Sequence, residues 1–363
     1  MILFKARLII GEQRWLPSLD ALKTAEAPFI LFRVLVVAAL IATILITFPL
    51  WQRHENPPML PLLALPVIDL GVLLIASLLL VLLRPVLGMV IYTALMVYAM
   101  LIDQFRLQPE FFSLTLLLWG TLPNRNSRNI ARAHLIALWI WAGLNKLLSP
   151  NFLHRTAQGL LHDLIPNPPL WIDDHAGYIL ALTEMGVGLL ILYPRTRKIS
   201  AMLAFGLHIG ILITLSPLGR NWNQAVWPWN IALAFAGFVF VLAWREWSLR
   251  EMLLHHRGVA IVVVTLMLTP VGFYFGLVDA YMAHNLYSSN VPRASSEAFS
   301  TQTSWEVFNV PTPPERRIYR QFFHLTCEPG DELRIRDERW WFRQRDQLLT
   351  QELCPQTVDD DDV

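Results

Sequence analysis

The sequence predicts an all-α polytopic membrane bundle of about nine transmembrane helices, followed by a small α+β domain outside the cytoplasm. Of its 363 residues, 55% are hydrophobic and only 16% are charged, whereas soluble domains carry about 25% charged residues. Nine apolar runs follow one another before the composition turns polar after residue 278. The net charge of +1 gives no basic surface, so no nucleic-acid partner is expected. The apolar runs are 28–50, 61–83, 86–102, 110–122, 131–148, 176–193, 199–216, 225–244 and 259–278.

The runs form the middle of a three-part chain. Residues 1–27 mix basic and apolar side chains and are expected to lie on the cytoplasmic face as an interfacial segment. Residues 28–278 form the transmembrane domain, in which most runs approach the roughly 20 residues that a helix needs to cross a bilayer. The run 110–122 is short and is expected to be tilted or re-entrant.

Basic residues predict the orientation of the bundle. With the N-terminus inside and nine crossings, most loop Lys and Arg residues lie on the cytoplasmic side, as the positive-inside rule requires. The chain has no Asn-x-Ser/Thr sequon, which fits a bacterial protein. We therefore expect a bacterial inner-membrane protein with a periplasmic or extracellular C-terminal domain. The outer loops would hold only Arg53, Arg106, Arg155 and Arg220.

The C-terminal region, residues 279–363, has the character of a small domain. Leu333 and Ile335 alternate with arginines after a Pro-Gly turn, which predicts a strand. Cys327 and Cys354 both fall on the outer, oxidising side and predict a disulfide worth about 3–4 kcal/mol on the loop-entropy model. The acidic end at 359–362 is expected to be a solvated, disordered tail.

Four ionisable residues are expected at membrane depth, where charges are costly and often functional. Lys146 either extends to water or acts as a buried base, and Glu184 either pairs with it structurally or accepts a proton. His208 is either a packing residue or a proton relay. Asp69 is placed near mid-bilayer in the second helix, with no chemical pattern around it. The histidines of the loop 149–175 lack a metal-ligand spacing, so no metal site is expected.

Asparagines and tryptophans suggest a binding pocket beside these groups. Asn223, Trp227 and Asn230 cluster at the mouth of one helix, and Asn145 adjoins the candidate lysine. An aromatic belt at the membrane interface explains the tryptophans alone. The asparagine amides need partners once buried, so the alternative is a cofactor pocket for a flat ring such as a quinone.

The segment Ala142-Gly143-Leu144-Asn145-Lys146-Leu147, with an acidic residue in the next helix and a histidine in the one after, resembles a known family. Over residues 130–245 the chain is similar to the HTTM domain of the vitamin K-dependent gamma-carboxylase and its bacterial relatives. The resemblance implies that Lys146 is the base that deprotonates a reduced quinone-type cofactor. The segment 101–105 lacks the carboxylase's assisting histidine, and the C-terminal region is much shorter than the carboxylase's. The lysine helix also resembles DoxX-like membrane proteins.

Two functions from different classes follow. The first is a quinone-linked oxidoreductase or carboxylase-like lyase in which Lys146, Glu184 and His208 are catalytic. The second is a non-catalytic membrane subunit that presents the C-terminal domain to a periplasmic protein partner. Transport is a third function, but no paired broken helices or repeats support it. A pocket lined by Trp227, Trp229 and Asn223 near Lys146 would favour the enzyme, and a filled core around a paired Lys146 would favour the subunit.

Overall fold

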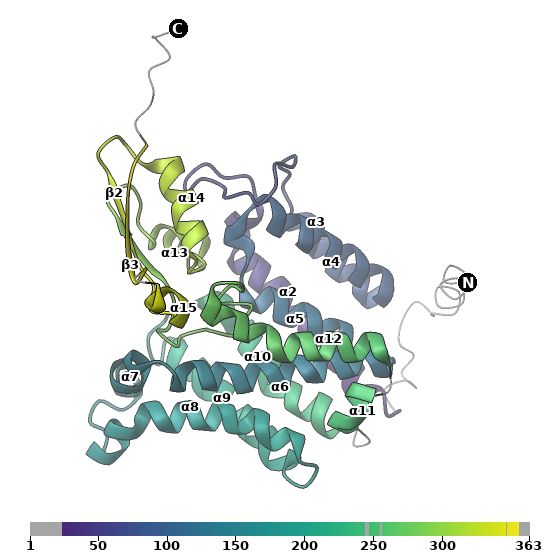
Figure 1. Ribbon diagram of the computed structural model, residues 1–363. Coiled ribbons are helices and arrows are strands. Elements are labelled where there is room, and N and C mark those ends of the chain that lie inside the picture. The colour runs from purple at the N-terminus through teal and green to yellow at the C-terminus, as the bar shows by residue number, and fades with distance from the viewer. Residues whose placement is uncertain (1–23, 244–246, 255, 346, 356–363) are drawn as a thin grey trace.

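The computed structural model describes residues 24–243, 247–254, 256–345 and 347–355. The predicted interfacial segment up to residue 23 and the acidic tail lie outside the described residues. Helices dominate the chain, and a three-stranded sheet lies near its C-terminal end (Figure 1). The helices that precede the sheet region are α2 Ala27–Ile46, α3 Gly71–Leu83, α4 Pro85–Ile102, α5 Pro109–Gly120, α6 Arg125–Leu147, α7 Ala157–Leu164, α8 Leu170–Leu192, α9 Arg197–Leu215, α10 Trp227–Gly237, α11 Leu249–Leu254 and α12 Arg257–Leu268.

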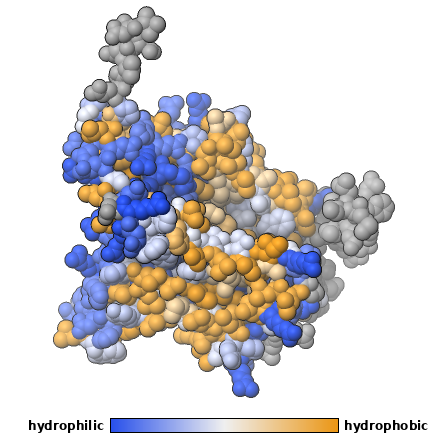
Figure 2. Space-filling view, viewed as in Figure 1, coloured by the Kyte–Doolittle hydropathy of each residue, from blue (hydrophilic) through white to orange (hydrophobic). Residues whose placement is uncertain are grey.

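The helical domain has the surface of a membrane protein. Within the described residues, six helical segments are long and apolar enough to cross a bilayer, and α3 is a shorter apolar helix. Apolar side chains gather over the helices, whereas hydrophilic side chains gather over the C-terminal domain (Figure 2). The membrane character is therefore confirmed, while the number of crossings stays a prediction. The six segments are Ala27–Ile46, Pro85–Ile102, Leu170–Leu192, Arg197–Leu215, Gln224–Leu242 and Arg257–Phe275.

The second predicted helix is shorter than expected, and this moves Asp69. The helix α3 begins only at Gly71, because the prolines at 61 and 66 each lack a backbone N–H and disfavour helical geometry in the preceding residue. Asp69 lies in the connection before α3, where its Oδ1 accepts a hydrogen bond from the Arg53 backbone N–H at 2.8 Å. The prediction of a mid-bilayer aspartate inside a helix was therefore wrong.

The helix α6 lies at the centre of the bundle and packs closely on α8. A Cβ atom added at Gly143 would lie 2.4 Å from the Met185 backbone nitrogen, and one added at Gly188 would lie 2.6 Å from Ile140 Cγ1. Such small residues let two helix backbones approach each other. The two segments are therefore in close contact, which places Lys146 opposite Glu184.

Buried arginines close one end of the bundle, which we call the arginine end. Carbonyl groups in the last turn of a helix lack helical partners and carry partial negative charge, so a guanidinium that donates to them is favourable. Each of four arginines, the half-buried Arg33 and three buried ones, donates to a carbonyl at or near the end of a helical segment. The donations are Arg33 Nη2 to Thr121 O, Arg128 Nε to Leu122 O, Arg132 Nε to Phe240 O and Arg197 Nε to Ile191 O.

The opposite end, which we call the sheet end, carries the C-terminal domain. Its strands β1 Arg293–Ser296, β2 Glu332–Arg336 and β3 Leu349–Leu353 form an antiparallel sheet in the order β1-β2-β3. The predicted strand is β2, with Leu333 and Ile335 buried. The domain's helices are α13 Thr303–Phe308, α14 Arg316–Thr326 and α15 Trp340–Gln344.

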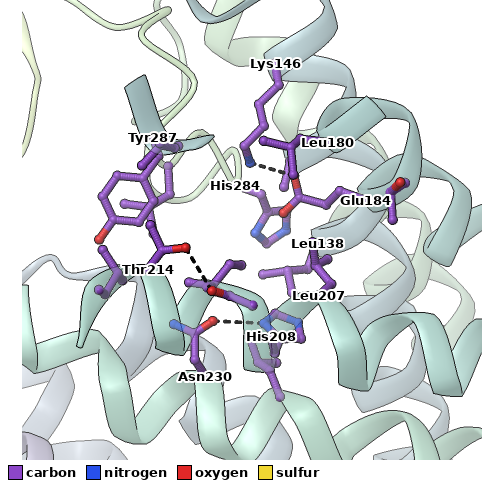
Figure 3. A pocket seen from close by; sticks show the side chains of 18 of the residues that line it. Leu138, Lys146, Leu180, Glu184, Leu207, His208, Thr214, Asn230, His284 and Tyr287 are labelled. Atoms are coloured by element: carbon purple, nitrogen blue, oxygen red, sulfur yellow. Dashed lines mark hydrogen bonds and ion pairs between the residues drawn. The ribbon is translucent and has the colours of Figure 1, made fainter. Parts of the chain in front are cut away.

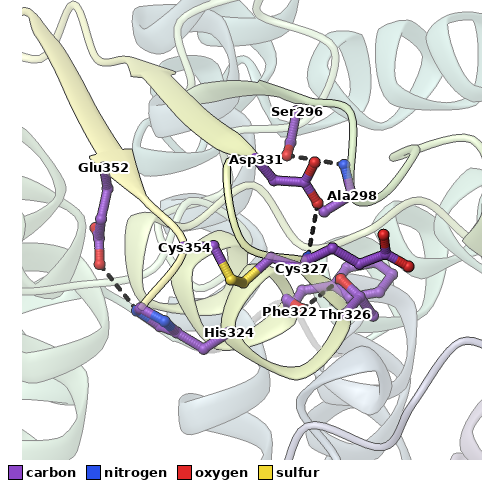
Figure 4. The surroundings of a disulfide bond; sticks show 10 residues. Ser296, Ala298, Phe322, His324, Thr326, Cys327, Asp331, Glu352 and Cys354 are labelled. Atoms are coloured by element: carbon purple, nitrogen blue, oxygen red, sulfur yellow. Dashed lines mark hydrogen bonds and ion pairs between the residues drawn. A yellow bond between two sulfur atoms is a disulfide. The ribbon is translucent and has the colours of Figure 1, made fainter. Parts of the chain in front are cut away.

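A disulfide and several bundle contacts fix this domain. Cys327 at the end of α14 is bonded to Cys354 after β3, as predicted (Figure 4). Gln104 Nε2 of the bundle donates to Gln321 Oε1 at 2.6 Å, and Arg317 pairs with Asp279. The region therefore combines short helices with a small sheet that is tied to the bundle through α14, while its division from the bundle as a separate domain stays a prediction.

Candidate functional site

A cavity of about 400 Å³ lies inside the helical domain toward the sheet end. Its walls come from α5, α6, α8, α9 and α10, and α7 and the connection after α12 also contribute lining residues. Most lining side chains are apolar, with a small set of polar ones. Cavities of this size, apolar with a few convergent polar groups, are typical of small-molecule sites. The polar lining residues are Ser113, His134, Lys146, Thr183, Glu184, His208, Thr214, Asn230, Tyr281, His284 and Tyr287.

Lys146 and Glu184 form an ion pair on the cavity wall (Figure 3). Lys146 Nζ lies 2.6 Å from Glu184 Oε2, and the two side chains are 13% and 10% exposed. The ammonium also lies 5.8 Å from the centre of the Phe152 ring. The pair is direct, yet both residues border open space rather than a filled core. It therefore presents a proton donor and a proton acceptor to the cavity.

His208 lines the same cavity but has both ring nitrogens engaged. Trp139 Nε1 donates to Nε2 at 3.0 Å, which leaves Nδ1 to donate to Asn230 Oδ1 at 2.9 Å. Asn230 in turn donates from Nδ2 to the Val226 carbonyl. These bonds favour a neutral ring with the proton on Nδ1. His208 and Asn230 thus reach the predicted cavity together, as a closed hydrogen-bond chain in its wall (Figure 3).

The other three predicted pocket residues do not line the cavity. Asn145 donates to the Ala283 carbonyl at 2.9 Å and accepts from the Tyr274 hydroxyl at 2.6 Å. Asn223 donates to the Tyr287 hydroxyl. Trp227 donates to the Trp222 carbonyl at 3.1 Å. The two asparagines therefore anchor the connection after α12, while Trp222 and Trp229 supply the aromatic lining.

This connection, residues 279–290, lies over the cavity, and we call it the cover loop. Its His284, Tyr287 and Ser289 have φ values of 56°, 57° and 58°, in the left-handed region that residues other than glycine adopt at a cost. His284 and Tyr287 line the cavity (Figure 3). Burial lowers the pKa of His284 to about 4, so its ring is neutral at neutral pH. The sequence analysis missed His284 and Tyr287, because nothing in the polar stretch after the last apolar run indicates that it folds over a cavity.

Glu315 of the C-terminal domain holds the start of the cover loop. Its Oε1 accepts from the Ala280 N–H at 2.6 Å, and its Oε2 lies 3.4 Å from Arg339 Nη1. Burial raises the pKa of Glu315 to about 7, and the positive charge of Arg339 opposes that rise. A carboxyl with a raised folded-state pKa contributes stability that is present at low pH and is lost as pH rises through the folded-state value.

We therefore expect the domain to be less stable at pH 8 than at pH 5, with the loss falling between about pH 4.5 and pH 7. Glu315→Gln, which cannot ionise, should flatten this dependence. Thermal unfolding followed at several pH values between 4.5 and 8 would measure it. The exposed Glu306→Gln is the matched control and should leave the wild-type profile unchanged. If Glu315→Gln and the wild type had the same dependence of stability on pH, Glu315 would not be the group responsible for it.

Part of the chain that lines the cavity is similar to a known family model. Residues 125–226 match the family model described as methylamine utilisation protein MauE. The match begins at the first residue of α6 and ends at Val226, just before α10. It covers 102 of the 363 residues and includes Lys146, Glu184 and His208. No curated protein and no solved structure matches the chain.

The MauE match corrects the resemblance drawn from the sequence. The stretch around Lys146 matches this family rather than the HTTM domain, so the similarity to the gamma-carboxylase, and the weaker one to DoxX-like proteins, was wrong. The motif behind it is six mostly apolar residues, a composition that many close-packed membrane helices share. The cover loop, α10 and the C-terminal domain lie outside the MauE-like segment.

Proposed function

We propose that this protein binds a lipid-soluble molecule with a polar ring, of the quinone class, in the cavity between α6, α8 and α9. The observation that carries the proposal is the cavity of about 400 Å³ with the Lys146–Glu184 pair on its wall. The apolar lining suits a ring and part of a hydrocarbon tail, and the ammonium suits a ring oxygen. A quinone supplies reversible two-electron chemistry; the residues here hold and orient it and keep a proton donor and acceptor beside it.

Glycines on α9 support a cavity that is open rather than packed. Added Cβ atoms at Gly206 and Gly210 would meet no heavy atom within 4 Å, and both residues line the cavity. Their role therefore differs from that of Gly143, where the close contact between helices is possible only because the residue has no side chain. Space of this kind leaves room for an apolar molecule beside α9.

We further propose that the protein lies in a bacterial inner membrane with the sheet end in the periplasm. The arginine end then faces the cytoplasm, in agreement with the positive-inside rule. The disulfide at the sheet end requires an oxidising compartment. On this topology the C-terminal domain lies in the periplasm, where it can act beside a periplasmic protein.

The alternative is a non-catalytic subunit, and the direct Lys146–Glu184 contact favours it. A salt bridge at 2.6 Å satisfies both charges without any ligand. A structural role, the alignment of α6 with α8, is then sufficient to explain the pair. The C-terminal domain would then carry the function by binding a partner. The two functions differ in one measurable property, which is ligand binding in the cavity.

The test is a steric block with a matched control. Gly210→Leu fills the cavity, whereas Gly186→Leu adds the same side chain where a Cβ also meets nothing, outside the cavity lining. We expect the purified wild type and Gly186→Leu to retain extractable quinone and to bind a short-chain quinone saturably, and Gly210→Leu to lose at least tenfold in affinity. Mass spectrometry of the extract and titration measure both. Absence of binding in the wild type, or equal binding in the two variants, would refute the cavity as the site.

A further inference from the structure

Two imidazole rings face each other on the cavity wall, apart from the predicted site residues. His134 comes from α6 and His284 from the cover loop, and their ring centroids are 5.4 Å apart. Both residues are buried and both line the cavity. Neither belongs to the Lys146–Glu184 pair or to the His208–Asn230 chain.

His134 has one ring nitrogen without a partner. Its Nε2 lies 2.8 Å from Ser113 Oγ, whereas its buried Nδ1 meets no hydrogen-bond partner among the described residues. His208 shows the contrast, since both of its nitrogens are bonded. Folded proteins rarely leave a buried polar atom unsatisfied, so such an atom beside a cavity points to a ligand.

His284, the second imidazole, reaches the cavity wall from a strained backbone conformation. His284 has a φ of 56°, and the surrounding loop is held by Asn145 through the Ala283 carbonyl. Non-glycine residues in this conformation persist only where the surrounding structure over-determines them, and they cluster at ligand sites. The His284 ring itself makes no hydrogen bond within the described part of the chain.

We propose that His134 and His284 form a second polar pole of the cavity and bind the ligand oxygen that Lys146 does not reach. This inference rests on the proposed function and narrows it to ring molecules with two oxygen atoms on opposite sides. An ammonium can only donate, but a neutral imidazole donates or accepts according to its tautomer. If the Ser113 hydroxyl donates to Nε2, Nδ1 of His134 carries the proton that is free for a ligand; if Nε2–H donates to Ser113, Nδ1 is the free acceptor. The pole can therefore hold either a carbonyl or a hydroxyl.

The experiment compares two bicyclic probes of nearly equal size in the full-length protein. Menadione has two carbonyl oxygens on opposite sides of its ring, and 1-tetralone has one. For menadione we expect His134→Phe and His284→Phe each to raise Kd about tenfold, the effect of one lost hydrogen bond. For 1-tetralone the same variants should leave Kd unchanged, while Lys146→Met raises it. His154→Phe is the control, because His154 is exposed and outside the cavity lining.

The outcomes separate the two proposals. If a histidine variant still binds 1-tetralone, its cavity is intact. His134→Gln keeps a polar side chain at this position and should therefore retain part of the menadione affinity that His134→Phe loses. Menadione binding that is unchanged in both histidine variants overturns the second pole and leaves the proposed function standing. Equal losses for the two probes also overturn it. If menadione does not bind the wild type saturably, the proposed function itself fails.

Discussion

Lys146→Met is expected to lower the free energy of unfolding of the helical domain by about 3 kcal/mol. Removing one partner of a buried salt bridge typically costs about 3–5 kcal/mol, because the other charge is left without compensation. The two side chains here are 13% and 10% exposed, which places the expectation at the lower end of that range. Glu184 lies in the middle of α8 and cannot extend to water as a lysine can. Thermal unfolding of the purified protein in detergent or nanodiscs measures the loss.

The double variant Lys146→Met/Glu184→Leu is the control for this prediction. It removes both charges and keeps similar volumes, so the stability should return to within about 1 kcal/mol of the wild type, as for other buried pairs replaced by apolar residues. A double variant as unstable as the single one would show that the loss does not come from the unpaired carboxylate. If stable, it also tests function cleanly: the binding proposal expects a folded protein with weakened ligand affinity, and the subunit alternative expects no ligand in either protein.

Gly143→Ala is expected to destabilise the bundle by about 3 kcal/mol, although it adds a single methyl group. The new Cβ would lie 2.4 Å from the Met185 nitrogen and 2.5 Å from the Ala181 oxygen, and both are backbone atoms that cannot rotate away. The helices α6 and α8 must therefore separate, and overpacking of a close interface costs about 1–3 kcal/mol or more. Thermal unfolding again gives the measurement.

The control for this substitution is Gly186→Ala, on α8. A Cβ there meets nothing within 4 Å, so the change should be neutral or stabilising by up to about 1 kcal/mol from helix propensity. Similar losses in the two alanine variants would contradict the close-contact explanation. The separation of α6 from α8 should also lengthen the Lys146–Glu184 contact, so Gly143→Ala should weaken ligand binding while Gly186→Ala should not.

The helices were predictable from apolar length, and their ends were predictable only where a local signal decides them. Strong runs such as Ala27–Ile46 and Pro85–Ile102 fall almost where the composition places them. The predicted start of the second helix was wrong, because the apolar residues around Pro66 were included in a helix that the backbone cannot form there. The proline that prevents the earlier start was visible in the sequence, but the prediction gave more weight to the hydropathy of the run.

Part of the candidate site was predictable, because an ionisable residue in an apolar run is conspicuous. Lys146, Glu184 and His208 were chosen on that ground, and the fold brings all three to one cavity. Whether they act on a ligand remains a proposal. His134 was overlooked because a single histidine in a long helix looks like a packing residue. The approach of His284 from a loop about 150 residues later depends on tertiary structure that no local pattern records.

The arginine end has a consequence for how the protein is made. Arg128 reaches the Glu26 carboxylate, Arg132 the Phe240 carbonyl and Arg197 the Trp247 carbonyl only after the helices have assembled, since each of these bonds joins residues at least 50 positions apart in the sequence. Before that moment the same guanidinium groups are hydrated charges that resist translocation across the bilayer. On the proposed topology, these charges orient the newly made chain first and are afterwards buried as caps. A charge that guides biogenesis is in this way hidden from the surface of the mature protein.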